Sequence, residues 1–324
     1  MGGLVTRLGR VSRRGVGDYD ECVSDLIIDR RPELRNPLLI AAWAGWSDAG
    51  ESATGAIRFM LRRWREEPFA HIEADQFYDF TQTRPLVRLD NGQRVIDWPK
   101  NEFTAHRLDG DGPDIIVMQG IEPHMSWHAY TAAVLEICTE FNVSGLVTLG
   151  GLLAEVSHLR PVRVTGSSDD TELRELLSVE PRRGGGYDGP TGIITVVNNA
   201  AREAGLKTAS LWASVPHYVN ASPNPKATLA LLERLNGAMS LGLRLHDLEV
   251  FVARFDAQVA EEVAKNSEMA DYARHIEEQQ EKIDDGLVQV SGAQEEQGGS
   301  EELPDAQSMV DELERFLREQ RGNN

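Results

Sequence analysis

Cysteine is scarce in this sequence, since its 324 residues contain only two, Cys22 and Cys138. Two widely separated thiols do not form a disulfide framework, so a reducing cytoplasm is the expected location. The sequence also lacks an apolar run near the ~20 residues that span a bilayer. Its first residues lack the apolar segment of a signal peptide. We therefore expect a cytoplasmic protein that does not enter the membrane.

Basic side chains are in short supply as well. The 33 Lys and Arg residues face 52 Asp and Glu residues, which gives a net charge of −19. Nucleic acids and anionic membranes would be repelled, so we expect neither as a partner. Residues 256–324 carry 19 acidic and 6 basic side chains, and therefore −13 of the charge. The acidity belongs mainly to the C-terminal region.

The catalytic and cofactor motifs that we considered are all incomplete. The stretch GWSDAG at 45–50 has the wrong glycine spacing for a dinucleotide-binding loop, and no Gly-Lys-Ser/Thr occurs. Alanine at position 49 breaks the Gly-x-Ser-x-Gly pattern that would make Ser47 a nucleophile. His124 and His128 have the spacing of a zinc pair, but no glutamate follows His124. We predict no cofactor and no metal, and we assign no catalytic residue.

Apolar runs alternate with helical patterns along the middle of the chain. Runs typical of strands buried on both faces occur at 38–43, 114–118, 144–149 and 207–213, with a shorter strand expected at 161–165. Apolar residues at helical spacing follow at 51–64, 127–141, 169–177, 191–205 and from 225. Asn91-Gly92, between the runs 86–89 and 94–98, predicts a β-hairpin. The pattern favours a doubly wound α/β sheet with a β-hairpin insertion.

Five segments are expected from these patterns. Residues 1–30 form a flexible N-terminal arm, 31–250 the α/β core domain, 251–285 a C-terminal helical extension, 286–304 a disordered linker, and 305–321 a short amphipathic helix. The linker is rich in Gly, Gln, Glu and Ser. A short helix after such a linker is typical of a weak docking element.

Four of the expected strands end in polar turns. Because the carboxyl ends of parallel strands share one edge of a sheet, these turns would converge there. The residues that could bind a ligand at this edge are Trp46, Ser47, Asp48, Gln119, Glu122, His124, Gly150, Gly151, Arg160, His217 and Tyr218. Turns between strands and helices also need Gly, Asp, Ser and Pro to cap the helices, so a ligand site and a set of capping turns both remain open.

Two of these residues have a competing structural role. Asp48 or Ser47 can cap the helix that follows, and we expect Asp48 to do so. Arg160 can bind a carboxylate or phosphate ligand through its guanidinium group. We expect it instead to pair inside the fold, with Asp48, Glu122 or Glu155.

Several short motifs occur in a characteristic order between Asp29 and Val259. They are Gly120–Pro123 with Trp127, Gly150-Gly151 with His158–Pro161, Tyr187–Gly192, Ser210–Tyr218, and Asn224-Pro225. Together they resemble the proteasome assembly chaperone 2 family, and most closely its actinobacterial branch. The resemblance implies a three-layer α/β/α sandwich similar to purine nucleoside phosphorylases, self-association with a trimer favoured, and no agreed catalytic residues. Proteasome chaperones dock through a C-terminal hydrophobic-Tyr-x motif, which the ending Glu319–Asn324 does not match.

Two functions from different classes follow. The first, which the resemblance favours, is a non-enzymatic assembly or interaction protein that forms homo-oligomers. The alternative is a nucleosidase- or phosphorylase-like enzyme, or a protein that only binds a metabolite, with its pocket at the carboxyl edge of the sheet. In the alternative function, the ring of Trp46 or Tyr218 could stack on a nucleoside base.

Overall fold

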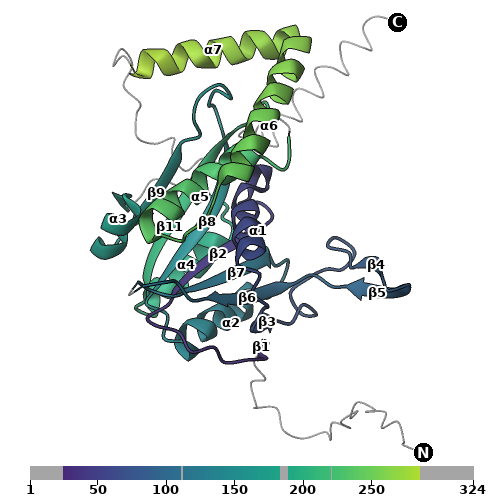
Figure 1. Ribbon diagram of the computed structural model, residues 1–324, viewed down its shortest axis with the longest axis vertical. Coiled ribbons are helices and arrows are strands. Elements are labelled where there is room, and N and C mark those ends of the chain that lie inside the picture. Colours follow the sequence, from purple (N-terminus) through teal and green to yellow (C-terminus); the bar gives the residue numbers. More distant parts are fainter. Residues whose placement is uncertain (1–24, 111, 183–188, 220, 285–324) are drawn as a thin grey trace, which may run out of the picture.

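The computed structural model describes residues 25–110, 112–182, 189–219 and 221–284 (Figure 1). Within them, nine strands form one sheet in the spatial order β1-β3-β6-β7-β2-β8-β11-β9-β10. The strands are β1 (Leu26–Ile28), β2 (Leu38–Ala44), β3 (Ala70–Ile72), β6 (Asn101–His106), β7 (Ile115–Ile121), β8 (Gly145–Ala154), β9 (Val164–Ser168), β10 (Glu180–Pro181) and β11 (Lys207–Pro216).

Parallel strands make up the centre of this sheet. β7, β2, β8 and β11 are neighbours and run in the same direction. The strands that flank this group are antiparallel to it, β6 beside β7 and β9 beside β11. The four apolar runs that the sequence predicts as buried strands are these four central strands. Their carboxyl ends therefore point toward one side of the sheet, where α/β proteins usually hold ligands.

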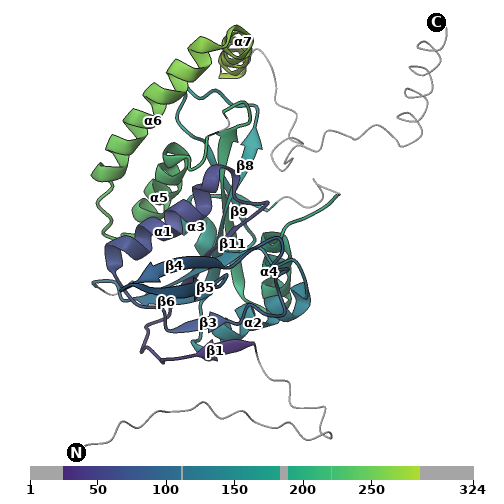
Figure 2. The ribbon, with the colours of Figure 1, turned by 90° about the vertical axis from the view of Figure 1, so that its right-hand side faces the viewer.

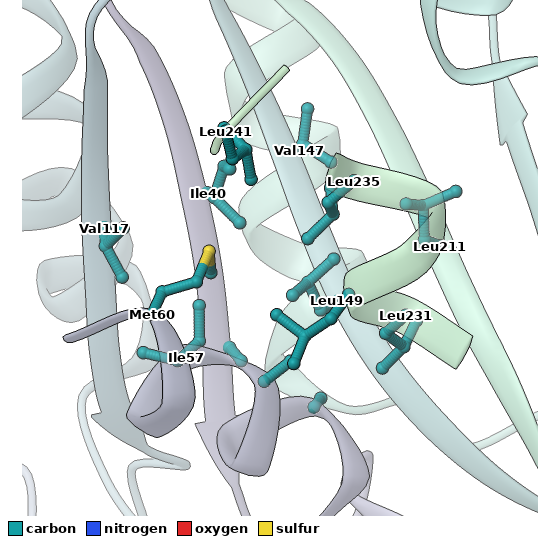
Figure 3. Close-up of a cluster of buried hydrophobic side chains, with 14 of the residues drawn as sticks. Ile40, Ile57, Met60, Val117, Val147, Leu149, Leu211, Leu231, Leu235 and Leu241 are labelled. Carbon is teal, nitrogen blue, oxygen red and sulfur yellow. The ribbon is translucent and has the colours of Figure 1, made fainter. Parts of the chain in front are cut away.

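Helices cover both faces of the sheet. The helices α1 (Ser52–Trp64), α3 (Thr171–Leu177) and α5 (Pro225–Met239) lie on one face, and α2 (Trp127–Glu140) and α4 (Ile193–Glu203) lie on the other (Figures 1 and 2). Side chains of β2 alternate between the faces. Ile40 lies in the cluster that contains Ile57 and Leu231 (Figure 3), whereas Leu39 lies in the cluster that contains Tyr130 and Val197. The expected mixed α/β fold is confirmed.

The predicted β-hairpin is present between β3 and β6. Its strands are β4 (Leu86–Asp90) and β5 (Gln93–Asp97), and they pair with each other in a sheet separate from the main one. Asn91 and Gly92 both have positive φ, 50° and 81°, as the two-residue turn of a tight hairpin requires. Figure 1 shows the hairpin projecting to the right of the body.

One expected strand is displaced along the chain. We expected a strand at 161–165, but β9 spans Val164–Ser168 and pairs with β11 from Val164 opposite Ala213. Pro161 has no N–H to donate to a strand ladder, which favours a later start. The helix after β9 begins as expected, because the Asp170 side chain accepts a hydrogen bond from Leu173 N and caps α3.

The chain after α5 forms an arm of two helices, α6 (His246–Lys265) and α7 (Ser267–Asp284). The sequence shows one helical pattern here, but the structure breaks it at Asn266, whose backbone is extended. The Asn266 side chain accepts hydrogen bonds from the N–H groups of Glu268 and Met269 and so caps α7. In Figure 1, α6 rises past α5, and α7 crosses above the sheet.

Several expectations lie outside the described residues. These are the arm up to residue 24, the linker 286–304 and the amphipathic helix 305–321. Among the helices that the structure does describe, none combines the length and the apolar character needed to cross a membrane.

Candidate functional site

The strands that carry the candidate residues do not all end at the same level. β2 ends at Ala44 and β7 at Ile121, but β8 and β11 pair over ten residues, from Gly145 opposite Lys207 to Ala154 opposite Pro216. Gly150 and Gly151 therefore lie inside β8 and not in a turn after it. Because β8 and β11 are longer, the residues that follow them, such as His217 and Tyr218, lie beyond the ends of β2 and β7.

Glu122 connects three of the elements at the carboxyl edge. Its backbone N–H donates to the carbonyl oxygen of Ala44 over 2.8 Å. Its side-chain Oε2 accepts from the backbone N–H of Trp46 over 3.1 Å, and Oε1 accepts from that of Ile193 over 2.8 Å. Ile193 is the first residue of α4, so the carboxylate lies at a helix N-terminus, where a negative charge is stabilised. The carboxylate occupies the position that an anionic ligand would take.

Two glycines allow close contacts around the turn after β2. A Cβ atom at Gly192 would lie 2.5 Å from Ser47 Oγ and 3.0 Å from Glu122 Oε1. A Cβ atom at Gly151 would lie 2.1 Å from Ser52 Oγ, and the Gly151 N–H donates to Ser47 O over 2.9 Å. The turn after β2 thus packs directly against β8 and the start of α4. Glycine at these two positions allows that approach.

Asp48 caps the first helix, as we expected. Its Oδ1 accepts from the N–H groups of Ala53 and Thr54 over 2.8 Å and 3.2 Å, and its Oδ2 bonds to the Thr54 hydroxyl. A 3₁₀ turn (Ala49–Glu51) separates Asp48 from α1, so the cap reaches across five residues. Burial raises the pKa of Asp48, while the hydrogen bonds from Thr54 oppose that shift.

Trp46 is the candidate residue that solvent reaches most easily at this edge. Its side chain is 58% exposed, and its ring lies beside Gly192. Packing does not account for an aromatic side chain in this position. Trp46 is therefore the group of this edge best placed to touch another molecule.

His217 and Tyr218 belong to a second cluster, beyond the ends of β8 and β11. The Tyr218 hydroxyl accepts from His158 N over 2.9 Å and lies 2.7 Å from His158 Nδ1. The Tyr272 hydroxyl of α7 lies 3.1 Å from His217 Nε2, and the rings of Tyr218 and Tyr272 meet edge to face. We call these four residues the arm cluster, because they join α7 to the body.

Arg160 lies next to the arm cluster. Its Nε donates to Glu277 Oε1 of α7 over 2.6 Å. We expected an internal carboxylate partner, which is confirmed, but the partner is none of Asp48, Glu122 and Glu155. Burial would raise the pKa of Glu277, yet the hydrogen bonds from Ser157 and Arg160 lower it. The guanidinium group therefore attaches the arm.

Gly150, inside β8, lies against the Trp212 ring, and the remaining two candidates also lie apart from both clusters. Gln119 is within β7, two residues before its end. His124 follows β7, where its Nδ1 accepts from Asp79 N over 3.0 Å and its N–H donates to Phe77 O over 2.8 Å. His124 thus orders the chain that leads to the hairpin. In the described parts of the chain, no three His, Cys, Asp or Glu side chains gather closely enough to hold a metal ion.

The structure therefore brings eight of the eleven candidates together at two places and leaves Gln119, His124 and Gly150 outside them. Ser47, Asp48, Glu122 and Gly151 lie around the ends of β2 and β7, together with Trp46, whose backbone N–H donates to Glu122. His217, Tyr218 and Arg160 meet α7. Two residues outside the set of sequence candidates, Tyr272 and Glu277, complete the second cluster. They lie in a charged helical segment with no signal that would distinguish them from solvated residues.

The fold is shared with known structures. The PAC2 family model matches residues 42–263. A PAC2 family protein from Streptomyces avermitilis is 39% identical, with 73% of this chain and 99% of that chain covered and a TM-score of 0.66. A proteasome-assembly chaperone homologue from Mycobacterium tuberculosis is 34% identical over 72% and 99% of the two chains, with a TM-score of 0.63. A second M. tuberculosis protein, of unknown function, is 25% identical over 85% and 94%, with a TM-score of 0.71. Among curated proteins, none matches.

The molecule is a mixed α/β protein. At the edge of its sheet, the carboxylates of Glu122 and Asp48 accept hydrogen bonds from backbone N–H groups of the same chain. The chain belongs to the PAC2 family, since the family model covers more than half of it and two solved structures are at least 34% identical.

Proposed function

We propose that this chain is a non-enzymatic assembly or interaction protein that works in the cytoplasm as a homo-oligomer, with a trimer favoured. Family membership supports this role, because one relative is described as a proteasome-assembly chaperone homologue. The observation that carries the proposal is the state of Glu122 and Asp48. Two backbone N–H groups hold each carboxylate, so both side chains have a structural role that accounts for their presence at this edge.

The test combines capture of partners with a deletion. The tagged chain is expressed at its native level, cross-linked in cells and purified, and its partners are identified by mass spectrometry. We expect copies of the chain itself and a stable protein partner. Recovery of no stable protein, together with normal proteasome assembly in a strain that lacks the gene, would contradict the proposal.

A second function is favoured by one observation, the exposed Trp46 ring beside Gly192. A nucleosidase- or phosphorylase-like enzyme, or a metabolite-binding protein of similar fold, would use this ring to stack on a base. The expected result is then a rise in melting temperature with a nucleoside or related metabolite, because a ligand stabilises the folded form that binds it. Trp46→Ala would abolish the rise. A broad screen without any shift would exclude this function.

A further inference from the structure

The β4–β5 hairpin presents an apolar face to solvent. Val87, Leu89 and Ile96 are exposed by 64%, 73% and 53%. Val87 lies opposite Ile96, and Leu89 lies opposite Arg94. Directly opposed residues of two strands share a face, and successive residues alternate between faces, so these four side chains point the same way. The other face is mixed, since it carries Arg88, Asp90, Gln93 and Asp97 together with Leu86 and Val95.

A hairpin of this kind needs a covering surface. Two strands alone are marginally stable in water, and this pair extends away from the body (Figure 1). Arg94, on the apolar face, forms no ion pair with any residue that the structure describes. A suitable partner surface is therefore apolar, with carboxylates around it.

The outer side of α6 is such a surface. Phe251 and Val250 are 59% and 42% exposed. Ala253, Ala257 and Ala264 are also exposed and follow Val250 at helical spacing, so a strand can approach this side closely. Charge is complementary as well. The helix α6, residues 246–265, has five acidic and two basic side chains, a net charge of −3. Residues 84–98 have three arginines and two aspartates, a net charge of +1.

We propose that the hairpin of one copy packs on the outer side of α6 of a second copy. This inference rests on the proposed self-association and assigns its contact surfaces. The apolar face of the hairpin has an area on the order of a few hundred Å², which is less than the ~800 Å² that each partner buries in a stable interface. One such contact is therefore small, but each copy makes two of them, because it offers its own hairpin and receives the hairpin of another copy. Such head-to-tail contacts close into a ring when the rotation between copies allows it.

Paired substitutions on opposite faces of β5 provide the first test. Ile96→Glu places a carboxylate in the apolar face, and Gln93→Glu places one in the mixed face of the same strand. We expect Ile96→Glu to weaken self-association at least about tenfold in light scattering at graded concentrations, and Gln93→Glu to leave it unchanged. Both variants should keep the wild-type circular dichroism spectrum. An oligomer that Ile96→Glu leaves intact overturns the inference.

Cross-linking between differently marked chains provides the second test. One chain carries Val87→Cys and the other carries Phe251→Cys. Both chains also carry Cys22→Ser, which removes a native thiol, and the other native thiol, that of Cys138, is buried. We expect a disulfide-linked dimer when the two chains are mixed and little from either chain alone. Equal cross-linking of the Val87→Cys chain with itself, or no cross-link in an intact oligomer, overturns the inference. A wild-type chain that is monomeric at all concentrations contradicts the proposed self-association itself, which separates the two failures.

Discussion

The Tyr218 hydroxyl lies 2.7 Å from Nδ1 of His158, and it also accepts the backbone N–H of the same residue. The Tyr218 hydroxyl can then donate its hydrogen to Nδ1 of a neutral His158 ring. This pair connects the end of β11 to the loop after β8, and the ring of Tyr272 packs against it. The Tyr218 phenol is therefore one of the groups that hold the C-terminal arm, together with the Arg160–Glu277 pair.

Tyr218→Phe should loosen the arm. The substitution leaves the His158 N–H and Nδ1 without their partner, and it should lower the free energy of unfolding by about 1–2 kcal/mol. Trypsin should also cut faster after Lys265, between α6 and α7. Tyr272→Phe is the matched control. It removes an exposed hydroxyl contact to His217 and should cost less than half as much. Equal effects of the two substitutions would show that the Tyr218 hydroxyl has no special role.

Acid should weaken the contact between arm and body. Burial and then the charge of Lys226 on α5 lower the pKa of His158, while Asp256 on α6 and Glu277 on α7 oppose this shift. The unfolded chain therefore binds more protons than the folded chain as the pH falls below about 6.5, and stability is lost in that range. His158→Gln should flatten the fall in melting temperature between pH 7.5 and pH 5.5. A parallel fall in both proteins would assign the acid sensitivity to other groups.

Glu122→Ala should destabilise the sheet edge. It leaves the N–H groups of Trp46 and Ile193 without their acceptor, at a cost of about 2–3 kcal/mol. Glu122→Gln keeps one acceptor oxygen and should cost about half as much. Glu175→Gln, an exposed change on α3, is the control and should be neutral. Chemical denaturation measures all three. A Glu122→Ala chain as stable as the wild type would show that the hydrogen bonds of Glu122 do not stabilise the fold.

Asp48→Ala should cost about 1–2 kcal/mol, because α1 loses its cap. Asp48→Asn should cost less than half of that. The amide oxygen still accepts from Ala53 and Thr54, and the buried charge, whose pKa burial raises, is removed. Thermal melts of both variants at pH 7 make the comparison. A larger loss for Asn than for Ala would mean that the negative charge itself is required.

The sequence predicts the sheet better than the site. The central strands are apolar throughout because they are buried on both faces, and Asn91-Gly92 identifies its turn through positive φ at two positions. Gly150-Gly151 suggests the end of a strand, because glycine pairs commonly form turns. Here they let the Ser52 and Trp212 side chains lie against a strand that continues to Ala154. The partner of Arg160 is 117 residues away, and no local pattern marks Glu277 among the other acids of α7.

The arm cluster also has a consequence for the order of folding during synthesis. Loop 155–163 and Tyr218 leave the ribosome well before Tyr272 and Glu277 do. Until α7 emerges, Arg160 has no Glu277 and His217 has no Tyr272, although β8 and β11 can already pair. Docking of the arm is therefore the last step that the described residues can complete, and a chain cut short before Ser267 exposes this cationic, aromatic surface.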